Sequence, residues 1–284
     1  MSTMLSVDGT NAMYRAFYAT ERRPMTDKKG TPTGAVGSFF GILLKQIREI
    51  NAKNCAVTFD VHGKNFRHEI YPEYKGTREK KPEVVAAIDA QIPIVIKLLG
   101  AYGITVVGKR GIEGDDIIGG FAVNHEGGDA YILSSDKDFA ALLVNKHVKL
   151  INPNKGIVTR KNCKEVFGIA AKQMVDFLML DGDEIDNIIG VPGVGIKTAQ
   201  KWFEQYRYAE DIPYEAFPRA FRKTVNEQQL RKRLKLNRKL ITIRTDLYDA
   251  SHLDTRIGER DTQAFARICE KHGLYALRKT VLGL

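Results

Sequence analysis

The sequence predicts an α/β fold in which a mostly parallel central sheet is flanked by helices and followed by a C-terminal helical region. Two observations lead to this prediction. In the first half of the chain, short apolar runs typical of buried strands alternate with longer amphipathic segments typical of helices. After about residue 160, strand-like runs become few and helical patterns follow one another. We therefore expect an α/β core over residues 1–160 and a helical region over residues 161–284.

Each expected element corresponds to a local pattern. Apolar runs predict strands at 4–7, 55–59, 104–107 and 130–133. Amphipathic segments predict helices in the first half at 34–50, 83–99 and 115–125. In the second half they predict helices at 161–167, 171–181, 196–206, 214–236 and 262–272. Pro32, Pro82 and Gly103 mark element boundaries.

The charge balance favours a partner that is rich in phosphate. The 284 residues carry a net charge of +10, and the stretch 219–244 is strongly basic. Lysine and arginine contacts to nucleic acid release condensed counterions, so such a surface suits DNA or RNA. The charge alone is also compatible with a generally basic globular protein. We expect no membrane partner, because we find no apolar stretch long enough to span a bilayer and no secretory signal at residues 1–7.

The cysteines point to a reducing, cytoplasmic setting. Cys55, Cys163 and Cys269 are odd in number and far apart, and no C-x-x-C pair occurs. This pattern argues against a disulfide framework and against a structural zinc site.

Aspartates follow several of the predicted strands directly. Asp8 follows the first strand, Asp60 the second, and Asp136 and Asp138 the fourth. Ligands of open α/β sheets bind beyond the carboxyl ends of the strands, so these side chains are expected at one rim. Each aspartate taken singly has a commoner explanation as a helix cap or turn residue. Their coincidence at three strands makes that explanation weaker.

Two further acidic groups extend the cluster. GIEGDDII places Glu113, Asp115 and Asp116 at the start of a helix, and GDEIDN contains Asp183 and Asp186. Nine carboxylates packed together would repel one another and raise several of their pKa values. Hard divalent cations resolve this conflict, and all-oxygen ligation points to Mg²⁺ or Mn²⁺. Two ions about 4 Å apart would stabilise both the attacking and the leaving oxygen of a phosphodiester.

A helix-hairpin-helix is expected over residues 172–206. The stretch DNIIGVPGVGIKTAQKWF places a glycine-rich turn before a helix that begins near residue 196. Glycines let the backbone approach phosphate closely, and free N–H groups at a helix start attract anions. Such contacts do not depend on base sequence. The candidate DNA-binding residues are Gly190, Gly193, Gly195, Lys197 and Thr198. The alternative is a glycine-rich loop that joins two core helices.

Five motifs in order resemble the 5′ nuclease family, which includes the N-terminal domain of bacterial DNA polymerase I, phage 5′ exonucleases and flap endonucleases. The motifs are VDGTNAMYRAFYA, FRHEIYPEYKGTR, GIEGDDIIGGFA, ILSSDKDFAALL and GDEIDNIIGVPGVGIKTA. The resemblance implies a PIN-like nuclease core and two metal sites. By motif, the residues that form or support the first site are Asp8, Asp60, Glu113, Asp115, Asp116 and Asp136. Those of the second site are Asp138, Asp183 and Asp186.

The resemblance also implies a helical arch around residues 70–100, through which the 5′ single strand passes. Tyr74 would stack on a base, while Lys75 and Arg78 would grip the scissile phosphate with Arg15 close by. The family further implies K⁺ held by backbone carbonyls near residues 190–195. From the residues alone, the preferred explanation of this segment is a solvated basic loop with a core tyrosine. The DNA partner would carry a 5′ single-stranded end or flap, and the protein would act as a monomer.

The predicted function is therefore a 5′-3′ exonuclease and 5′-flap endonuclease that uses two metal ions. One alternative is a non-catalytic relative that only binds DNA structures, although the presence of Asp183 and Asp186 speaks against it. Another is an Asp-dependent ribonuclease or phosphatase. A small-molecule phosphatase needs neither the hairpin nor the basic segment.

Overall fold

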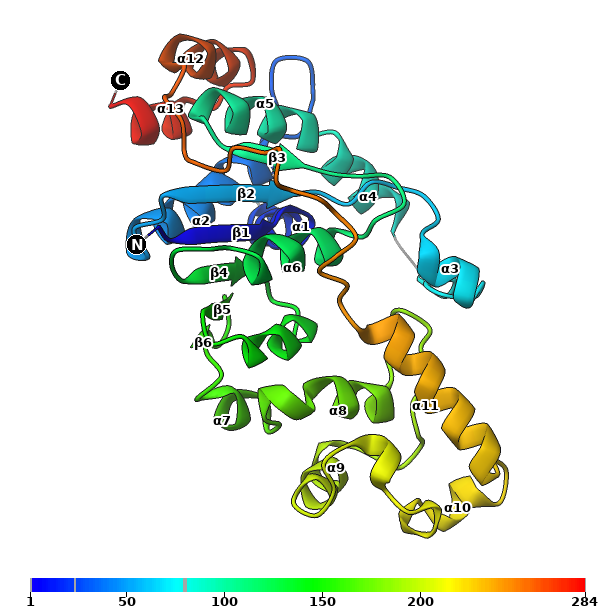
Figure 1. Cartoon of the computed structure of the whole chain (residues 1–284). Coiled ribbons are helices and arrows are strands. Elements are labelled where there is room, and N and C mark those ends of the chain that lie inside the picture. The colour runs from blue at the N-terminus through cyan, green and yellow to red at the C-terminus, as the bar shows by residue number, and fades with distance from the viewer. Residues whose placement is uncertain (1, 23, 79–80, 284) are drawn as a thin grey trace.

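The structure, a computed structural model, describes residues 2–22, 24–78 and 81–283. Its centre is a six-stranded sheet with the strand order β3-β2-β1-β4-β5-β6 (Figure 1). The strands are β1 (Met4–Asp8), β2 (Asn54–Thr58), β3 (Thr105–Val107), β4 (Ala130–Leu133), β5 (Val148–Asn152) and β6 (Gly156–Val158). Neighbours from β3 to β5 pair in parallel, and β6 alone pairs antiparallel to β5. The predicted mostly parallel sheet is confirmed, while β5 and β6 were not among the predicted strands.

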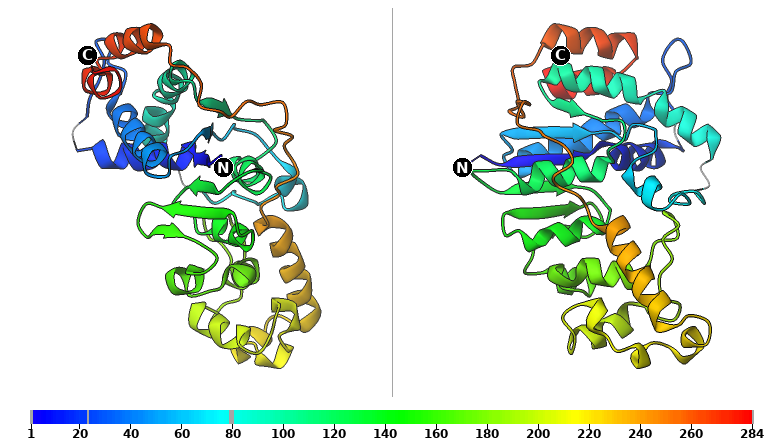
Figure 2. Two further views of the ribbon diagram at one scale, coloured as in Figure 1. Left: turned by 60° about the vertical axis from the view of Figure 1, so that its left-hand side comes forward. Right: turned by 45° about the vertical axis from the view of Figure 1, so that its right-hand side comes forward.

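Helices cover both faces of this sheet (Figure 2). They are α1 (Gly9–Thr20), α2 (Gly34–Glu49), α3 (Phe66–Ile70), α4 (Pro82–Asp89), α5 (Ile92–Tyr102) and α6 (Gly114–Val123), with the 3₁₀ helix η1 (Asp138–Val144). Successive side chains of a strand point to opposite faces. Accordingly, Leu5 and Val7 of β1 join the core with α2 and α5, whereas Met4 joins the core with α6.

The segment Pro82–Tyr102 corrects the expectation that the chain contains no apolar stretch long enough to span a bilayer. The segment has 21 residues, and an 18-residue window within it has a mean hydropathy of 1.8, so by length and composition it could cross a membrane. In the fold it forms two helices, α4 and α5, and α5 packs into the core through buried side chains such as Leu98 and Leu99. The C-terminal part of the expected arch at 70–100 is thus a core helix. Residues 79 and 80 of that segment lie outside the described residues.

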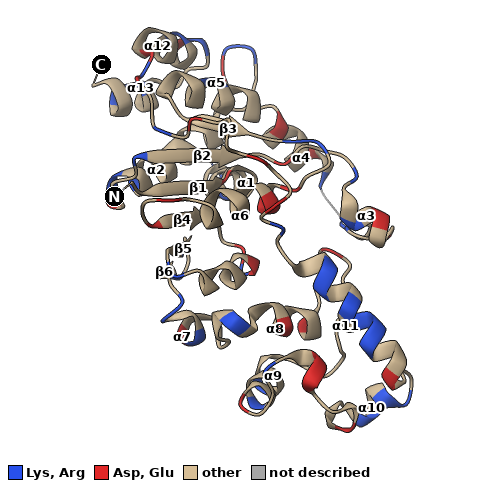
Figure 3. Ribbon diagram, in the orientation of Figure 1, with Lys and Arg blue, Asp and Glu red and all other residues tan. Residues whose placement is uncertain are grey.

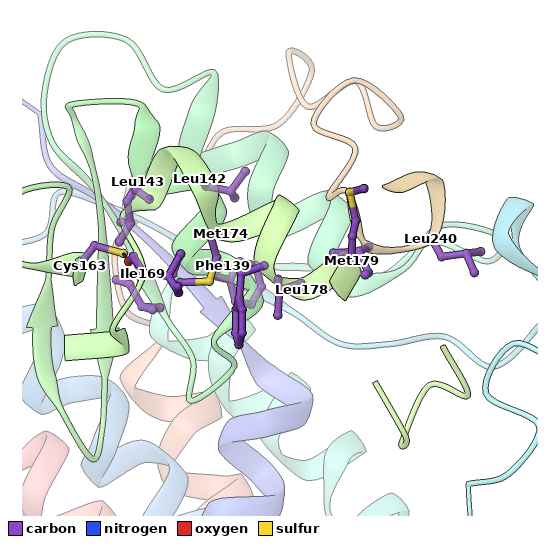
Figure 4. Close-up of a cluster of buried hydrophobic side chains, with 14 of the residues drawn as sticks. Phe139, Leu142, Leu143, Cys163, Ile169, Met174, Leu178, Met179 and Leu240 are labelled. Carbon is purple, nitrogen blue, oxygen red and sulfur yellow. Dashed lines mark hydrogen bonds between the residues drawn. The ribbon is translucent and has the colours of Figure 1, made fainter. Parts of the chain in front are cut away.

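The helical region follows β6 and is joined to the sheet by a shared core. It contains α7 (Cys163–Phe167), η2 (Ala171–Gln173), α8 (Met174–Asp181), α9 (Ile196–Phe203), η3 (Ala209–Asp211), η4 (Tyr214–Ala216), α10 (Arg219–Arg222) and α11 (Glu227–Ile241). Figure 4 shows side chains of η1, α7, α8 and α11 meeting in one apolar cluster, among them Phe139, Met174 and Leu240.

The single helix predicted at 214–236 is wrong, because the chain forms three shorter elements there. Pro218 precedes α10, and proline is favoured where a new helix starts. The Asn226 side chain then accepts a hydrogen bond from the Gln229 N–H and caps α11 at a distance of 2.9 Å. Each restart therefore has a local cause in the sequence.

The end of the chain returns to the α/β core, contrary to the expectation that residues 161–284 form one helical region. α12 (Thr262–Lys271) packs on α5, and α13 (Tyr275–Leu282) packs on α2 (Figure 1). Phe265 and Cys269 enter the same buried cluster as α2 and α5. The approach is fixed by backbone hydrogen bonds, including one of 2.7 Å from the Cys55 N–H to the Thr255 carbonyl. All three cysteines are buried and unbridged.

Candidate active site

Three strand ends bring aspartates to one edge of the sheet, as the sequence predicts. β1 ends at Asp8, which pairs in register with Thr58 at the end of β2. Val7 pairs with Leu133 at the end of β4. Asp60 and Asp136 follow these ends within three residues, so all three carboxylates belong to the same rim.

Asp8 performs the ordinary capping role and also belongs to a charged cluster. Its Oδ1 accepts the Asn11 N–H at 2.9 Å and caps α1, while its Oδ2 accepts the Ser134 hydroxyl at 2.8 Å. Burial raises the pKa of Asp8 to about 7, and the charges of Asp60 and Asp136 add to this effect. A helix cap alone does not need two further carboxylates beside it.

The start of α6 adds Asp115 to this rim. Burial raises the pKa of Asp115 well above its ordinary value, and the charges of Asp136, Asp8 and Asp60 raise it further. Asp60 is held against the same helix start, because its Oδ1 accepts the Gly114 N–H at 2.9 Å. A Cβ atom at Gly114 would lie 2.9 Å from that oxygen, so a side chain there would displace Asp60.

Asp136 and Asp138 connect this group to the acids after α8. Burial raises the pKa of Asp136, and the charges of Asp183 and Asp186 raise it as well. Burial likewise raises the pKa of Asp138 well above its ordinary value, followed by the charges of Asp136 and Asp183. Since charge repulsion decays with distance, these couplings place the two predicted groups of acids in one cluster.

Asp116 differs from its neighbours and is better described as a support than as a metal ligand. It is 1% exposed, and both of its oxygens accept hydrogen bonds from the Arg67 guanidinium, at 2.7 and 2.8 Å. Its Oδ1 also accepts the Arg244 N–H at 2.8 Å. The Arg67 guanidinium lies 2.9 Å from Glu113 as well, so it fixes the N-terminal end of α6. Sequence reasoning missed Arg67, although it lies within the motif FRHEIYPEYKGTR.

Two cationic side chains of the segment after α3 form ion pairs with Glu113 and Asp186. Lys75 forms an ion pair with Glu113 and lies 3.8 Å from Asp186, and the Arg78 Nε donates to Asp186 at 3.2 Å. Lys75 adopts a φ of 59°, in the left-handed region that non-glycine residues rarely occupy. Such backbone strain concentrates at functional sites. The structure groups Lys75 and Arg78 with the acids, and their predicted contact with the scissile phosphate stays a prediction.

Tyr74 does not present a face for stacking on a base in this structure. The residue is 4% exposed, and its hydroxyl lies 3.1 Å from Glu113 and 3.0 Å from Asp186. The Lys75 ammonium lies over its ring at 4.9 Å from the centroid, and His68 packs edge-on. Burial and the charges of the two acids raise the pKa of the Tyr74 phenol, which keeps it a hydrogen-bond donor. Its position indicates that it orients carboxylates.

A cleft of about 710 Å³ opens beside the acids, between the β5–β6 hairpin and α9. Its lining includes Asp136, Asp138 and Asp183, together with Lys137 and Lys155. Arg15 lies near this hairpin, with its guanidinium 3.4 Å from the Asn154 side-chain oxygen. The structure thus places Arg15 beside Asn154, one of the residues that line the cleft.

The donor set fits hard divalent cations, although the acids are not arranged as ligands in this structure. Within residues 2–22, 24–78 and 81–283, no three His, Cys, Asp or Glu side chains stand in a metal-ligating arrangement. Glu113 and Asp186 are turned toward Arg67, Lys75 and Arg78. Burial, and after it the charges of neighbouring acids, raise the pKa values of Asp8, Asp115, Asp136 and Asp138, and oxygen-binding cations relieve that charge repulsion.

The hairpin between α8 and α9 has the predicted form, with α9 starting at Ile196. Gly193 has a φ of 81°, and Gly195 has open space around its missing side chain. Lys197 is exposed in the first turn of α9, and Thr198 is half-buried.

Gly190 has a different role from the one expected. A Cβ atom there would lie 2.2 Å from the Asp181 carbonyl oxygen, so this glycine is needed for close packing against the end of α8. The contact closes the loop that carries Asp183 and Asp186. Gly190 therefore serves the fold at this point.

Comparison with known protein families gives two adjacent matches. Residues 3–168 match the family model of the 5′-3′ exonuclease N-terminal resolvase-like domain, and residues 169–263 match that of the 5′-3′ exonuclease C-terminal SAM fold. The border between them falls eight residues after the one expected from the sequence.

Among curated proteins, the chain is 32% identical over 287 residues to a 5′-3′ exonuclease of Aquifex aeolicus, covering 99% of this chain and 96% of that protein. It is 37% identical over 211 residues to DNA polymerase I of Mycobacterium bovis, covering 72% of this chain. It spans only 23% of the length of that polymerase.

Solved structures with the same fold include proteins that handle DNA. The 5′-exonuclease of bacteriophage T5 with bound zinc ions aligns with a TM-score of 0.69 and 20% identity, over 95% of this chain and 99% of that one. The catalytic core of Rad2 in complex with DNA substrate aligns with a TM-score of 0.55 and 18% identity, over 100% of this chain and 89% of that one. At these identities the likeness establishes the fold.

Proposed function

Because the chain belongs to the 5′-3′ exonuclease family, we propose that it is a structure-specific 5′ nuclease that hydrolyses DNA phosphodiester bonds. The observation that carries the proposal is the gathering of acids from three strand ends, the start of α6 and the loop after α8 into one repelling cluster. The helix-hairpin-helix beside this cluster supports a DNA substrate. Exonuclease and 5′-flap endonuclease activities are both proposed.

Eight of the nine predicted acids would hold two divalent ions, with Mg²⁺ proposed and Mn²⁺ as a substitute. Asp8, Asp60, Glu113, Asp115 and Asp136 would serve one ion, and Asp138, Asp183 and Asp186 the other. Such ions supply Lewis-acid activation of water and of the phosphate oxygens. Asp116 supports this set from behind through Arg67.

Lys75 and Arg78 would act on the scissile phosphate. Both now neutralise acids of the metal set, Lys75 at Glu113 and Arg78 at Asp186. When cations take over that neutralisation, the ammonium and the guanidinium are free to contact the substrate's phosphate oxygens. Fixed positive groups of this kind stabilise charge that develops in the transition state. Arg15 would contact the same strand from the edge of the cleft.

The hairpin would hold the duplex by its backbone. Gly193, Gly195, Lys197 and Thr198 lie at or just before the start of α9, where free N–H groups attract phosphate. A K⁺ ion at hairpin carbonyls stays part of the proposal. One of those carbonyls, that of Gly190, already accepts the Arg233 guanidinium at 3.4 Å. We further propose that the protein acts as a monomer in the cytoplasm.

The test uses purified protein with three labelled DNA substrates: a 5′-flap duplex, a matched 3′-flap duplex and the single strand. Each is incubated with Mg²⁺ or with a chelator, and the products are sized. We expect release of the 5′ flap with Mg²⁺ only, shortening from 5′ ends, and an intact 3′ flap.

The variant Asp183→Asn is expected to lower the cleavage rate at least a hundredfold while flap binding persists, and Asp211→Asn on η3 serves as the matched control. A bound but uncut flap in the wild type would favour a DNA-binding module. Cleavage of RNA or of a phosphate monoester, with DNA left intact, would favour a ribonuclease or phosphatase.

A further inference from the structure

We propose that Lys232, Lys235 and Lys239 of α11 form a second contact surface for duplex DNA, separate from the hairpin. We call these three residues the lysine stripe. The inference rests on the proposed function, which supplies the DNA, and concerns a part of the chain that none of the predicted site residues occupies.

The stripe follows from the helical spacing of the three lysines. Positions 232, 235 and 239 lie on one side of a helix, and all three residues are exposed. The opposite side of α11 is buried through Leu230, Leu234 and other apolar side chains. With a rise of about 1.5 Å per residue, the stripe is roughly 10 Å long. That length spans more than one phosphate along a DNA strand.

The arginines of the same helix are already committed to the fold. Arg238 pairs with Asp176 at 2.9 Å and also with Glu210, and Arg231 donates to the Glu210 carbonyl at 2.8 Å. Arg233 lies over the Phe221 ring and reaches the Gly190 carbonyl. In the described part of the chain, no such ion pair involves the three lysines. Figure 3 shows basic residues along α11.

Hydrogen bonds attach the helix that carries the stripe to the segment that carries the hairpin. The Asn237 side-chain amide donates to the Met179 and Ile189 carbonyls, each at 2.9 Å, and so ties α11 both to α8 and to the loop before the hairpin. α11 also packs along α8. These contacts hold α11, and with it the lysine stripe, at a fixed position relative to the hairpin.

The chemistry of the stripe favours duplex backbone over other ligands. Lysine is a compact, strongly hydrated charge that binds phosphate without requiring a fixed geometry. Recognition of single strands instead uses aromatic side chains that stack on bases, and α11 contains none. Contacts of this kind fix position on the duplex and carry no base specificity.

The experiment measures binding of the 5′-flap duplex in chelator, so that the DNA stays intact, over a series of KCl concentrations. The variant carries Lys232→Gln, Lys235→Gln and Lys239→Gln together. A charge-matched control carries Lys97→Gln, Lys271→Gln and Lys279→Gln, which lie on α5, α12 and α13, away from α11 (Figure 1). A third protein replaces the three stripe lysines with arginine.

We expect the stripe variant to lower the magnitude of the slope of log affinity against log salt by roughly one per lysine, about three in total, equally for two unrelated duplex sequences. The control and the arginine variant keep the wild-type slope. Equal slopes for the stripe variant and the wild type, with unchanged thermal unfolding, would overturn the proposal. Failure of the proposed function is seen separately, as an uncut flap in the wild-type reaction with Mg²⁺.

Discussion

Replacing Arg67 tests the support beneath the acid cluster. The guanidinium donates to the Leu240 carbonyl at 2.7 Å and to the Thr242 carbonyl at 3.1 Å, in addition to its contacts with Asp116 and Glu113. Arg67 is 2% exposed. The change Arg67→Met removes all of these contacts and leaves the Asp116 carboxylate buried without its cation.

The expected loss is roughly 3–5 kcal/mol of unfolding free energy, which is the usual cost of stranding one member of a buried ion pair. Since both groups are buried, solvent screening does not reduce this figure. Urea unfolding followed by circular dichroism measures it as a shift of the midpoint. The exposed pair Arg256–Asp254 provides the control, and Arg256→Met should leave the urea midpoint unchanged.

Two more variants separate the effect of the stranded Asp116 charge from that of the lost Arg67 contacts. Arg67→Lys keeps one positive charge but cannot reach all the acceptors, so its stability should lie between those of the wild type and Arg67→Met. Arg67→Met combined with Asp116→Leu removes the stranded charge and should recover part of the loss. A loss below about 1 kcal/mol for Arg67→Met would refute this account of the support.

Three other predictions concern the same site. The pKa of Asp8 rises from 3.8 in the unfolded chain to about 7 in the folded protein, so the metal-free folded state binds more protons between those pH values. Its melting temperature should therefore fall as the pH rises from 4 to 7, and Mg²⁺ should restore it. A melting temperature that does not change with pH would contradict this. Gly114→Ala should weaken Mn²⁺ binding, because the added methyl group would displace Asp60. Gly37→Ala is the control: its methyl group meets open space in α2, so thermal unfolding should show stability raised by roughly 0.5–1 kcal/mol. Tyr74→Phe should weaken metal binding about 10–100-fold, measured by calorimetry, because the lost hydroxyl contacts two acids of the cluster. Unchanged metal affinity together with weaker binding of single-stranded DNA would instead support the stacking role of Tyr74.

The sequence predicted the sheet and the shared rim because these follow from local patterns. Apolar runs that end in aspartate mark β1, β2 and β4, and parallel pairing then brings their ends together. The short strand β6 gave no such signal, since Gly156 and Ile157 are exposed and only Val158 is buried. The return of α12 and α13 to the core depends on long-range packing around Phe265 that periodicity does not contain.

In the candidate site, too, local patterns predicted some features, while others depend on long-range contacts. The acids could be found by position along the chain, but their individual roles could not. Asp115 and Asp116 are neighbours in one motif, yet one turns to the cluster and the other to a buried arginine from a distant helix. Tyr74 could not be distinguished from a stacking residue, because its burial depends on Glu113 and Asp186, which lie far away in the sequence.

The number of divalent ions that the protein binds tests the central claim most directly. Equilibrium dialysis against Mn²⁺ should give about two ions per chain at saturation for the wild type and about one for Asp183→Asn, because the acids form two sites of which Asp183 serves one. No saturable Mn²⁺ binding, or an equal count in both proteins, would contradict the assignment of the acid cluster as a two-metal centre.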